Sequence, residues 1–164
     1  FLNLLQGVRE KGFYLLASTN RPEKIDERLL EPGRLSSIIH VPLPHFKDRF
    51  GVLQNHAKEL PFKDEEDKES ILKRIAEHTE GWTQRYLHQL CQEASRQCIL
   101  LGVGGNIQQK TESSTVFRLK AEHFEKALDV LSPTINIKNL HEQDEGIRAF
   151  VSKQEKAVGF QSDS

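Results

Sequence analysis

Residues 13–44 read FYLLASTNRPEKIDERLLEPGRLSSIIHVPLP. Residues 13–17 are continuously apolar, which is typical of a strand covered on both faces in a parallel sheet, and residues 38–41 form a second short apolar run. The first run ends in Ser18, Thr19 and Asn20. Because ligands of parallel α/β sheets bind beyond the carboxyl ends of the strands, Asn20 is expected to lie where a ligand binds. This stretch therefore predicts the edge of an α/β core.

The residues between the two apolar runs predict a turn and a short helix. Arg21 and Pro22 make the turn, and Asp26 is expected to cap the helix because its carboxylate accepts hydrogen bonds from N–H groups of the first turn. Pro32-Gly33 ends the helix and presents Arg34. Taken alone, an arginine after a Pro-Gly turn is an ordinary surface residue.

Four motifs in this stretch follow one another in a characteristic order: STNRP (18–22), ID (25–26), PGRL (32–35) and PLP (42–44). The string resembles the second region of homology of AAA+ ATPases, and most closely the tandem-domain subfamily of valosin-containing protein. The resemblance implies an α/β fragment of a AAA+ P-loop NTPase core followed by an all-α lid subdomain. Residues 1–44 correspond to the C-terminal part of the large subdomain, 45–135 to the helical lid and 136–164 to a C-terminal extension.

The resemblance assigns catalytic roles to two residues of the stretch. Asn20 corresponds to sensor 1, which orients the attacking water near the γ-phosphate, and Arg34 to an arginine finger that reaches the nucleotide of the neighbouring subunit. Phosphoryl transfer depends mostly on positioning and on stabilising charge on the γ-oxygens, so a guanidinium supplied in trans contributes strongly. Glu31 and Ser37, however, stand where the family often has further arginines. A carboxylate repels a triphosphate, so the finger contribution is expected to be weakened or lost.

The chain after residue 44 has mostly helical periodicity. Apolar stripes predict helices over residues 48–61, 71–76, 87–101 and 123–131, with the acidic run 64–67 at a helix N-terminus and a polar, glycine-rich loop over 102–115. Further helices are predicted over 1–11 and, as a short segment, around 147–151. Cys91 and Cys98 lack a C-x-x-C pattern, so we expect buried thiols on one helix face and no metal site.

The resemblance also assigns candidate nucleotide-binding residues in the lid: His56, Gly81, Trp82, Gln84 and Arg85. His56 falls where a histidine often approaches the adenine, although a histidine beside an apolar stripe is more often a packing residue. Gly81 and Trp82 match the family's turn into the third lid helix, whereas Gln84, Arg85 and Tyr86 replace its Gly-Ala-Asp. Either adenine is held differently, with Arg85 near phosphate or ribose, or the site binds nucleotide poorly.

Composition excludes several classes of protein. The 23 basic and 24 acidic side chains give a net charge of −1, which is no electrostatic footprint for nucleic acid. No apolar run approaches the roughly 20 residues that span a bilayer, and no signal-peptide pattern is present. We expect an intracellular protein, cytoplasmic or nuclear. An origin or clamp-loader type of ATPase is the third interpretation, supported by Arg85 alone, which stands near the place of a sensor 2 arginine.

The sequence begins at Phe1 and contains no methionine, so it is expected to be a fragment or a processed piece. Neither the G-x-x-x-x-G-K-[ST] loop nor an acidic Walker B strand occurs in it. By the resemblance both lie upstream, together with the ligands of Mg²⁺. ATP and Mg²⁺ are the implied cofactors, and ATP hydrolysis is expected only from the full-length protein.

Two functional interpretations remain. The first is part of a AAA+ ATPase that couples ATP binding and hydrolysis in a homo- or hetero-hexameric ring to remodelling, unfolding or disassembly of protein complexes, with protein clients or adaptors as partners. The alternative is a degenerate AAA+ scaffold or adaptor subunit without its own turnover. Glu31 and the replacement at residues 84–86 support the alternative.

Overall fold

The computed structural model describes residues 14–104 and 117–158, and these divide into two compact units. One unit is Leu43–Leu140, and the other combines the residues up to Pro42 with those from His141 onwards. The predicted helix over residues 1–11 and most of the predicted loop over 102–115 lie outside the described residues.

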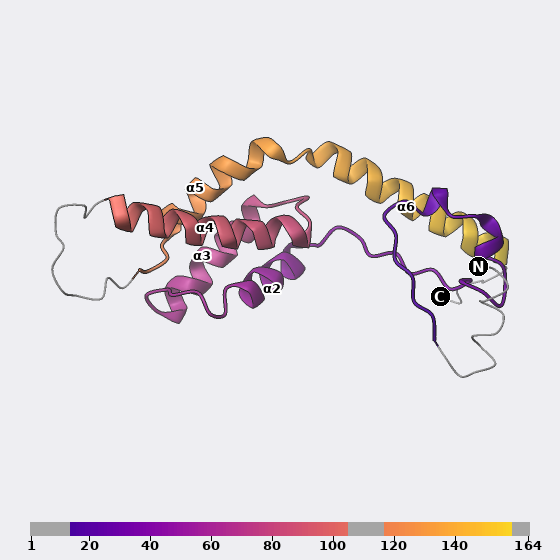
Figure 1. Ribbon diagram of the computed structural model, residues 1–164, viewed down its shortest axis with the longest axis horizontal. Coiled ribbons are helices and arrows are strands. Elements are labelled where there is room, and N and C mark those ends of the chain that lie inside the picture. Colours follow the sequence, from indigo (N-terminus) through magenta and orange to yellow (C-terminus); the bar gives the residue numbers. More distant parts are fainter. Residues whose placement is uncertain (1–13, 105–116, 159–164) are drawn as a thin grey trace. The chain divides into compact units, whose positions relative to one another are not determined.

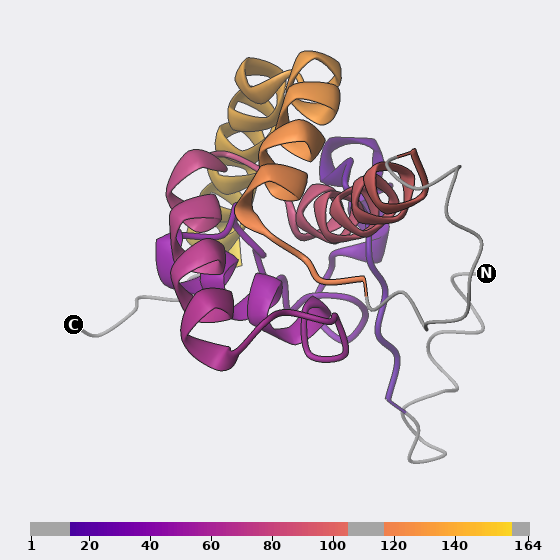
Figure 2. The ribbon, with the colours of Figure 1, turned by 90° about the vertical axis from the view of Figure 1, so that its left-hand side faces the viewer.

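The unit Leu43–Leu140 is helical. It contains α2 (Phe46–His56), α3 (Glu65–His78), α4 (Gln84–Gly104), α5 (Ala121–Leu131) and the short 3₁₀ helix η3 (Ser132–Thr134). Helix α4 packs against α2 and α5, and α2 packs against α3 (Figure 1). Viewed from the side, the four helices surround one common centre (Figure 2). The four helices predicted from apolar stripes between residues 48 and 131 are thus confirmed.

Local sequence explains where these helices begin. The Asp64 carboxylate accepts a hydrogen bond of 2.8 Å from the Asp67 N–H, so the acidic run predicted at a helix N-terminus belongs to the first turn of α3. Helix α3 therefore starts at Glu65, six residues before the predicted start. In α5 the ring of His123 caps the helix, since its Nδ1 accepts from the Lys120 N–H at 3.0 Å.

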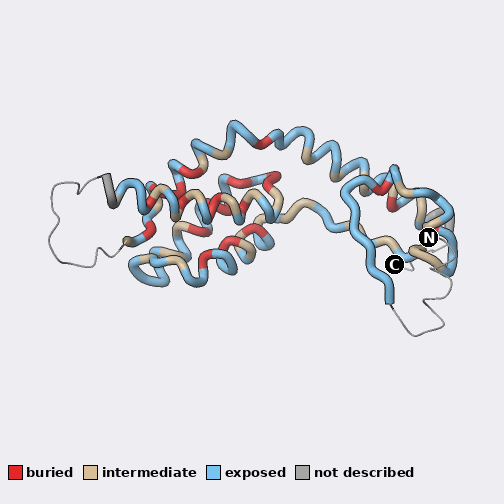
Figure 3. Tube along the Cα trace, viewed as in Figure 1, coloured by how far each residue is buried: buried red, intermediate tan, exposed pale blue. Residues whose placement is uncertain are grey.

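The core of this unit lies between the inward faces of α2 to α5 (Figure 3). Fully buried side chains include Leu53, Leu72, Trp82, Leu90 and Phe124. Phe124 stacks on Phe62, with ring centroids 6.1 Å apart, next to an isolated parallel β-bridge between Phe62 and Leu119. The predicted burial of Cys91 and Cys98 is confirmed: both thiols are free, with 3% and 5% of each residue exposed.

Arg49 is a buried charge in this unit that the apolar stripe did not predict. It is 6% exposed; its Nε donates to the Ala76 carbonyl at 3.1 Å and its Nη1 to the Pro44 carbonyl at 2.9 Å. Ala76 lies in the last turn of α3, where backbone carbonyls lack intrahelical donors and the helix dipole favours a cation. The guanidinium therefore joins α2 to the end of α3.

The other unit contains the 3₁₀ helices η1 (Pro22–Lys24) and η2 (Glu27–Leu29) and most of α6 (Ile137–Val158). Within it, His40 Nε2 lies 3.0 Å from Asp144 Oδ1 of α6. The short helix predicted around 147–151 is in fact part of the 22-residue α6. The prediction was too short because only a few of its residues are apolar, while α6 is helical over many polar positions as well.

The predicted α/β core is not confirmed, because residues 14–17 and 38–41 form no strand in the structure. A strand exists as a ladder of hydrogen bonds to a neighbouring strand, and these two segments find no ladder partner among the described residues. Most of their apolar residues are correspondingly exposed: Leu16 is 91% and Ile39 is 81% exposed. The fold that the structure establishes is a mostly helical one.

Candidate functional site

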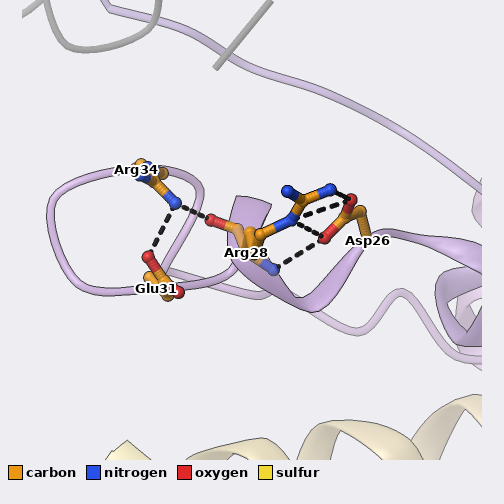
Figure 4. A network of polar contacts seen from close by, with 4 residues as sticks. All are labelled: Asp26, Arg28, Glu31 and Arg34. Carbon is orange, nitrogen blue, oxygen red and sulfur yellow. Dashed lines mark hydrogen bonds and ion pairs between the residues drawn. The ribbon is translucent and has the colours of Figure 1, made fainter. Parts of the chain in front are cut away.

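Residues 26–34, the Arg34 loop, hold the predicted arginine finger (Figure 4). The Arg34 N–H donates to the Glu31 carbonyl at 3.1 Å, and Gly33 has a φ of +90°. A proline at the second position, a glycine of positive φ at the third and this hydrogen bond are features of a type II turn. The Pro-Gly pair therefore brings the side chains of Glu31 and Arg34 to the same side of a tight turn.

The guanidinium of Arg34 is bound within its own loop. Arg34 Nη1 lies 2.6 Å from Glu31 Oε2, and the same nitrogen donates to the carbonyl of Arg28. The Arg34 side chain is 19% exposed and that of Glu31 is 54% exposed. Glu31, singled out in the sequence because it replaces a basic residue, is thus the direct ion-pair partner of the predicted finger.

A second ion pair stabilises the start of the loop. As predicted, the Asp26 carboxylate caps a short helix, η2, by accepting from the Arg28 N–H at 3.0 Å. It also accepts from Arg28 Nε at 3.0 Å and Nη2 at 2.5 Å. These side-chain bonds, followed by the backbone bond, lower the pKa of Asp26 to about 2. The Arg28 guanidinium is thus paired with Asp26, and the cation that donates to Glu31 is Arg34.

Asn20, the predicted sensor, belongs to the same unit as Arg34. It is exposed and makes no side-chain hydrogen bond to the described part of the chain, whereas the nearby Thr19 Oγ1 accepts from the Arg21 N–H at 3.0 Å. The structure gives no hydrogen bond or ion pair between Asn20 and Arg34.

His56, the predicted adenine neighbour, stacks on His88 at the exposed surface of α2 and α4. Their ring centroids are 4.4 Å apart and the rings are inclined by 22°. Burial, together with repulsion from His88, lowers the pKa of His56, so the neutral ring is favoured. The two stacked rings form an aromatic surface of the kind on which a planar base stacks. His88 was not predicted, because nothing in the sequence reports that α2 and α4 are neighbours.

The turn before α4 holds the remaining predicted residues. Gly81 is buried with a φ of +76°, and Trp82 is 2% exposed in the core, edge-on to Tyr86 at 6.3 Å. Gln84 and Arg85 are exposed in the first turn of α4. Trp82 thus packs the turn, while Gln84 and Arg85 offer polar groups at the surface.

A cavity of about 420 Å³ in the helical unit lies elsewhere and includes none of the predicted site residues. Its lining contains four cations, Lys63, Arg74, Arg118 and Lys120. Three of these are paired with nearby carboxylates: Lys63 with Asp64 at 3.8 Å, Arg74 with Glu125 at 2.5 Å, and Lys120 with Glu122 at 3.6 Å. The basic lining is therefore largely neutralised.

Residues 14–104 and 117–158 lack two wider features. No cluster of three or more His, Cys, Asp or Glu side chains suited to a metal ion is present there. Over the same residues, none of the helices combines the length and the apolar character that crossing a bilayer requires.

Comparison with known proteins finds relatives along nearly the whole sequence, although no protein-family model matches. The chain is 30% identical to cell division control protein 48 homolog C of Arabidopsis thaliana over 161 residues, which is 97% of this chain and 19% of that protein. It is 31% identical to the cell division cycle protein 48 homolog of Archaeoglobus fulgidus over 152 residues, 91% of this chain and 20% of the relative. With homolog B of Arabidopsis thaliana the identity is 32% over 140 residues, 85% of this chain and 21% of that protein. The chain spans about a fifth of the length of these curated relatives.

Proposed function

Since the chain belongs to the Cdc48-related AAA+ ATPases, we propose that it is the segment of such an ATPase that carries sensor 1, the arginine finger and the helical lid. The observation that carries the proposal is the similarity over up to 97% of the chain, a span long enough that it includes the STNRP and PGRL motifs. The full-length protein then binds ATP with Mg²⁺ and hydrolyses it in a ring, homo- or hetero-hexameric, to remodel protein complexes. Its partners are neighbouring subunits, protein clients and adaptors, in the cytoplasm or nucleus.

The proposal divides the chain into three parts. Residues 1–44 are the end of the large ATPase subdomain, 45–135 the helical lid and 136–164 a C-terminal extension. The exposed apolar segments 14–17 and 38–41 are consistent with this division, because in a complete core they would be covered by neighbouring strands.

The residues present have chemistry that fits a nucleotide. Asn20 offers an exposed amide for orienting a water, and the stacked His56 and His88 offer a flat surface for a base. The backbone of Gly81, in the turn before α4, and the side chains of Gln84 and Arg85, in the first turn of α4, supply polar contacts near the helix that carries His88. Bound ATP supplies the phosphoryl group, and Arg34 contributes positive charge in trans to the nucleotide of the neighbouring subunit.

Substitution of Arg34 in the full-length protein tests this function. We expect Arg34→Ala to lower steady-state ATPase turnover of the assembled ring, while the affinity of the same subunit for nucleotide stays unchanged, because the guanidinium acts on the neighbour. A finger supplied in trans is worth about 10³–10⁵ in rate where its removal is complete. Arg28→Ala is the matched control, since this arginine lies in the same loop and is 66% exposed. Unchanged turnover in Arg34→Ala rings of normal size would refute the finger assignment.

The second candidate function is a scaffold or adaptor subunit without turnover. The specific observation in its favour is that Glu31 occupies the Arg34 guanidinium at 2.6 Å. Glu31→Arg separates the two candidates. A gain in ring ATPase indicates an enzyme damped by Glu31, whereas unchanged turnover with preserved assembly favours the scaffold.

A further inference from the structure

We propose that Glu31 is a positioning residue that holds Arg34 folded back on its own loop, so that a neighbouring phosphate must displace the Glu31 carboxylate from Nη1 before it binds the whole guanidinium. The inference rests on the proposed finger function of Arg34. It adds a regulatory step, because the loop alternates between an ion pair within the subunit and a contact between subunits.

The hydrogen bonds of Arg34 support an exchange of the Glu31 carboxylate for a phosphate. A guanidinium has five N–H donors, and both contacts of Arg34, to Glu31 Oε2 and to the Arg28 carbonyl, use the single nitrogen Nη1. Nε and Nη2 have no partner among the described residues, and the side chain is 19% exposed. An incoming phosphate therefore first meets free donors and then competes with the carboxylate for Nη1.

The backbone of the turn keeps the two residues of the ion pair close together. Leu35 N–H donates to the Leu29 carbonyl at 2.9 Å and Arg34 N–H to the Glu31 carbonyl at 3.1 Å, so the turn is closed on both sides. Glu31 and Arg34 are three residues apart across this turn, and forming their contact orders little additional chain. The turn thus allows the ion pair to form locally, without packing against other elements.

The strength of the pair suits a restraint that a phosphate can overcome. Glu31 is 54% exposed, and exposed ion pairs contribute only about 0.2–1 kcal/mol because water screens them. A phosphate group carries more negative charge than a carboxylate and accepts charge-assisted hydrogen bonds in the same geometry. Glu31 therefore slows the engagement of Arg34 without preventing it.

The test uses the full-length protein with Glu31→Gln, which keeps the shape of the side chain and removes its charge. We expect turnover of the assembled ring to rise by a factor of about 1.4 to 5, the range that an exposed ion pair allows. Glu27→Gln is the matched control, because this carboxylate lies in the same loop, is exposed and makes no side-chain contact with Arg34. In an Arg34→Ala background, Glu31→Gln should have no effect on turnover.

A second readout is independent of ATP. Phenylglyoxal modifies accessible guanidinium groups, and the extent of modification at Arg34 is measured by mass spectrometry of nucleotide-free protein. We expect faster modification in Glu31→Gln than in the wild type or in Glu27→Gln. If Arg34→Ala lowers turnover but Glu31→Gln changes neither turnover nor labelling, the positioning role is refuted and the finger function stands. If Arg34→Ala leaves turnover unchanged, the finger function fails, and this inference fails with it.

Discussion

Substitution of Arg49 by methionine should destabilise the helical unit strongly for a single change. Arg49 is 6% exposed, and its guanidinium donates two hydrogen bonds to backbone carbonyls, 3.1 Å to Ala76 and 2.9 Å to Pro44. No carboxylate pairs with Arg49 among the described residues, so the two carbonyls are its stabilising partners there. Methionine fills the volume of the aliphatic stem but donates no hydrogen bond.

The size of the stability loss follows from the two backbone carbonyls that lose their donor. The Ala76 residue is buried, so its carbonyl loses a charged donor where water does not easily replace it, at a cost of about 1–3 kcal/mol. That carbonyl still accepts one weak hydrogen bond, of 3.5 Å, from Thr79 Oγ1. Pro44 is half-buried, and water can solvate its carbonyl at small cost. Removal of a buried charge gives some stability back. The expected net loss is about 2 kcal/mol.

Urea unfolding followed by tryptophan fluorescence measures this loss. Trp82 is the only tryptophan in the sequence and is 2% exposed in the same unit, so its emission reports the unfolding of this core. With an m-value of about 1–2 kcal/mol per M, the midpoint should fall by roughly 1–2 M. Arg85→Met is the control, because Arg85 is exposed on α4. A midpoint for Arg49→Met equal to that of the control would refute the reasoning.

Three further predictions test individual features of the structure. Lowering the pH from 7.5 to 5.5 should destabilise the protein, because burial lowers the pKa of both His56 and His123, while the unfolded chain, with histidine pKa near 6.5, binds protons more readily. The dependence of the free energy of unfolding on pH should be weaker in His56→Gln, and a stability that rises as the pH falls would contradict the prediction. Burial raises the pKa of Cys91 to about 12, so its thiol should react with Ellman's reagent only at the rate of unfolding; rapid reaction in native buffer would show that the thiol is accessible. Gly51→Ala in α2 should stabilise the protein by about 0.5–1 kcal/mol, since a Cβ there meets no atom within 4 Å, whereas Gly33→Ala should cost about 1–2 kcal/mol because φ is +90°. Equal urea midpoints of the two variants would refute the conformational argument.

The helices and their caps were largely predictable because their signals are local. Apolar spacing predicted α2 to α5, and the carboxylates of Asp26 and Asp64 cap η2 and α3 through N–H groups only two or three residues away. The prediction for residues 14–17 and 38–41 depended instead on partners far along a chain. An apolar run shows that a segment prefers burial, but only a neighbouring strand can make it a strand, and the described residues provide none.

The candidate site, too, was predictable from the sequence only where its signals are local. The sequence pointed to Asn20, Arg34 and the unusual Glu31, and it indicated the turn between Glu31 and Arg34, because proline and glycine impose that turn by their own backbone preferences. It did not predict the contact of 2.6 Å between the two side chains, which depends on rotamers that the turn allows but does not dictate.

By itself, the sequence determined the family, the helical periodicity and the position of the Arg34 loop, since each of these is written in residues close together along the chain. Only the tertiary structure decided that His56 stacks on His88, 32 positions away, and that Arg49 binds the carbonyl of Ala76. Arg49 stands four residues before Leu53 on the apolar face of α2, and that spacing was the one available signal of its burial. A buried arginine is stable only where acceptors converge on it, and the packing of α2 against α3 determines where those acceptors lie.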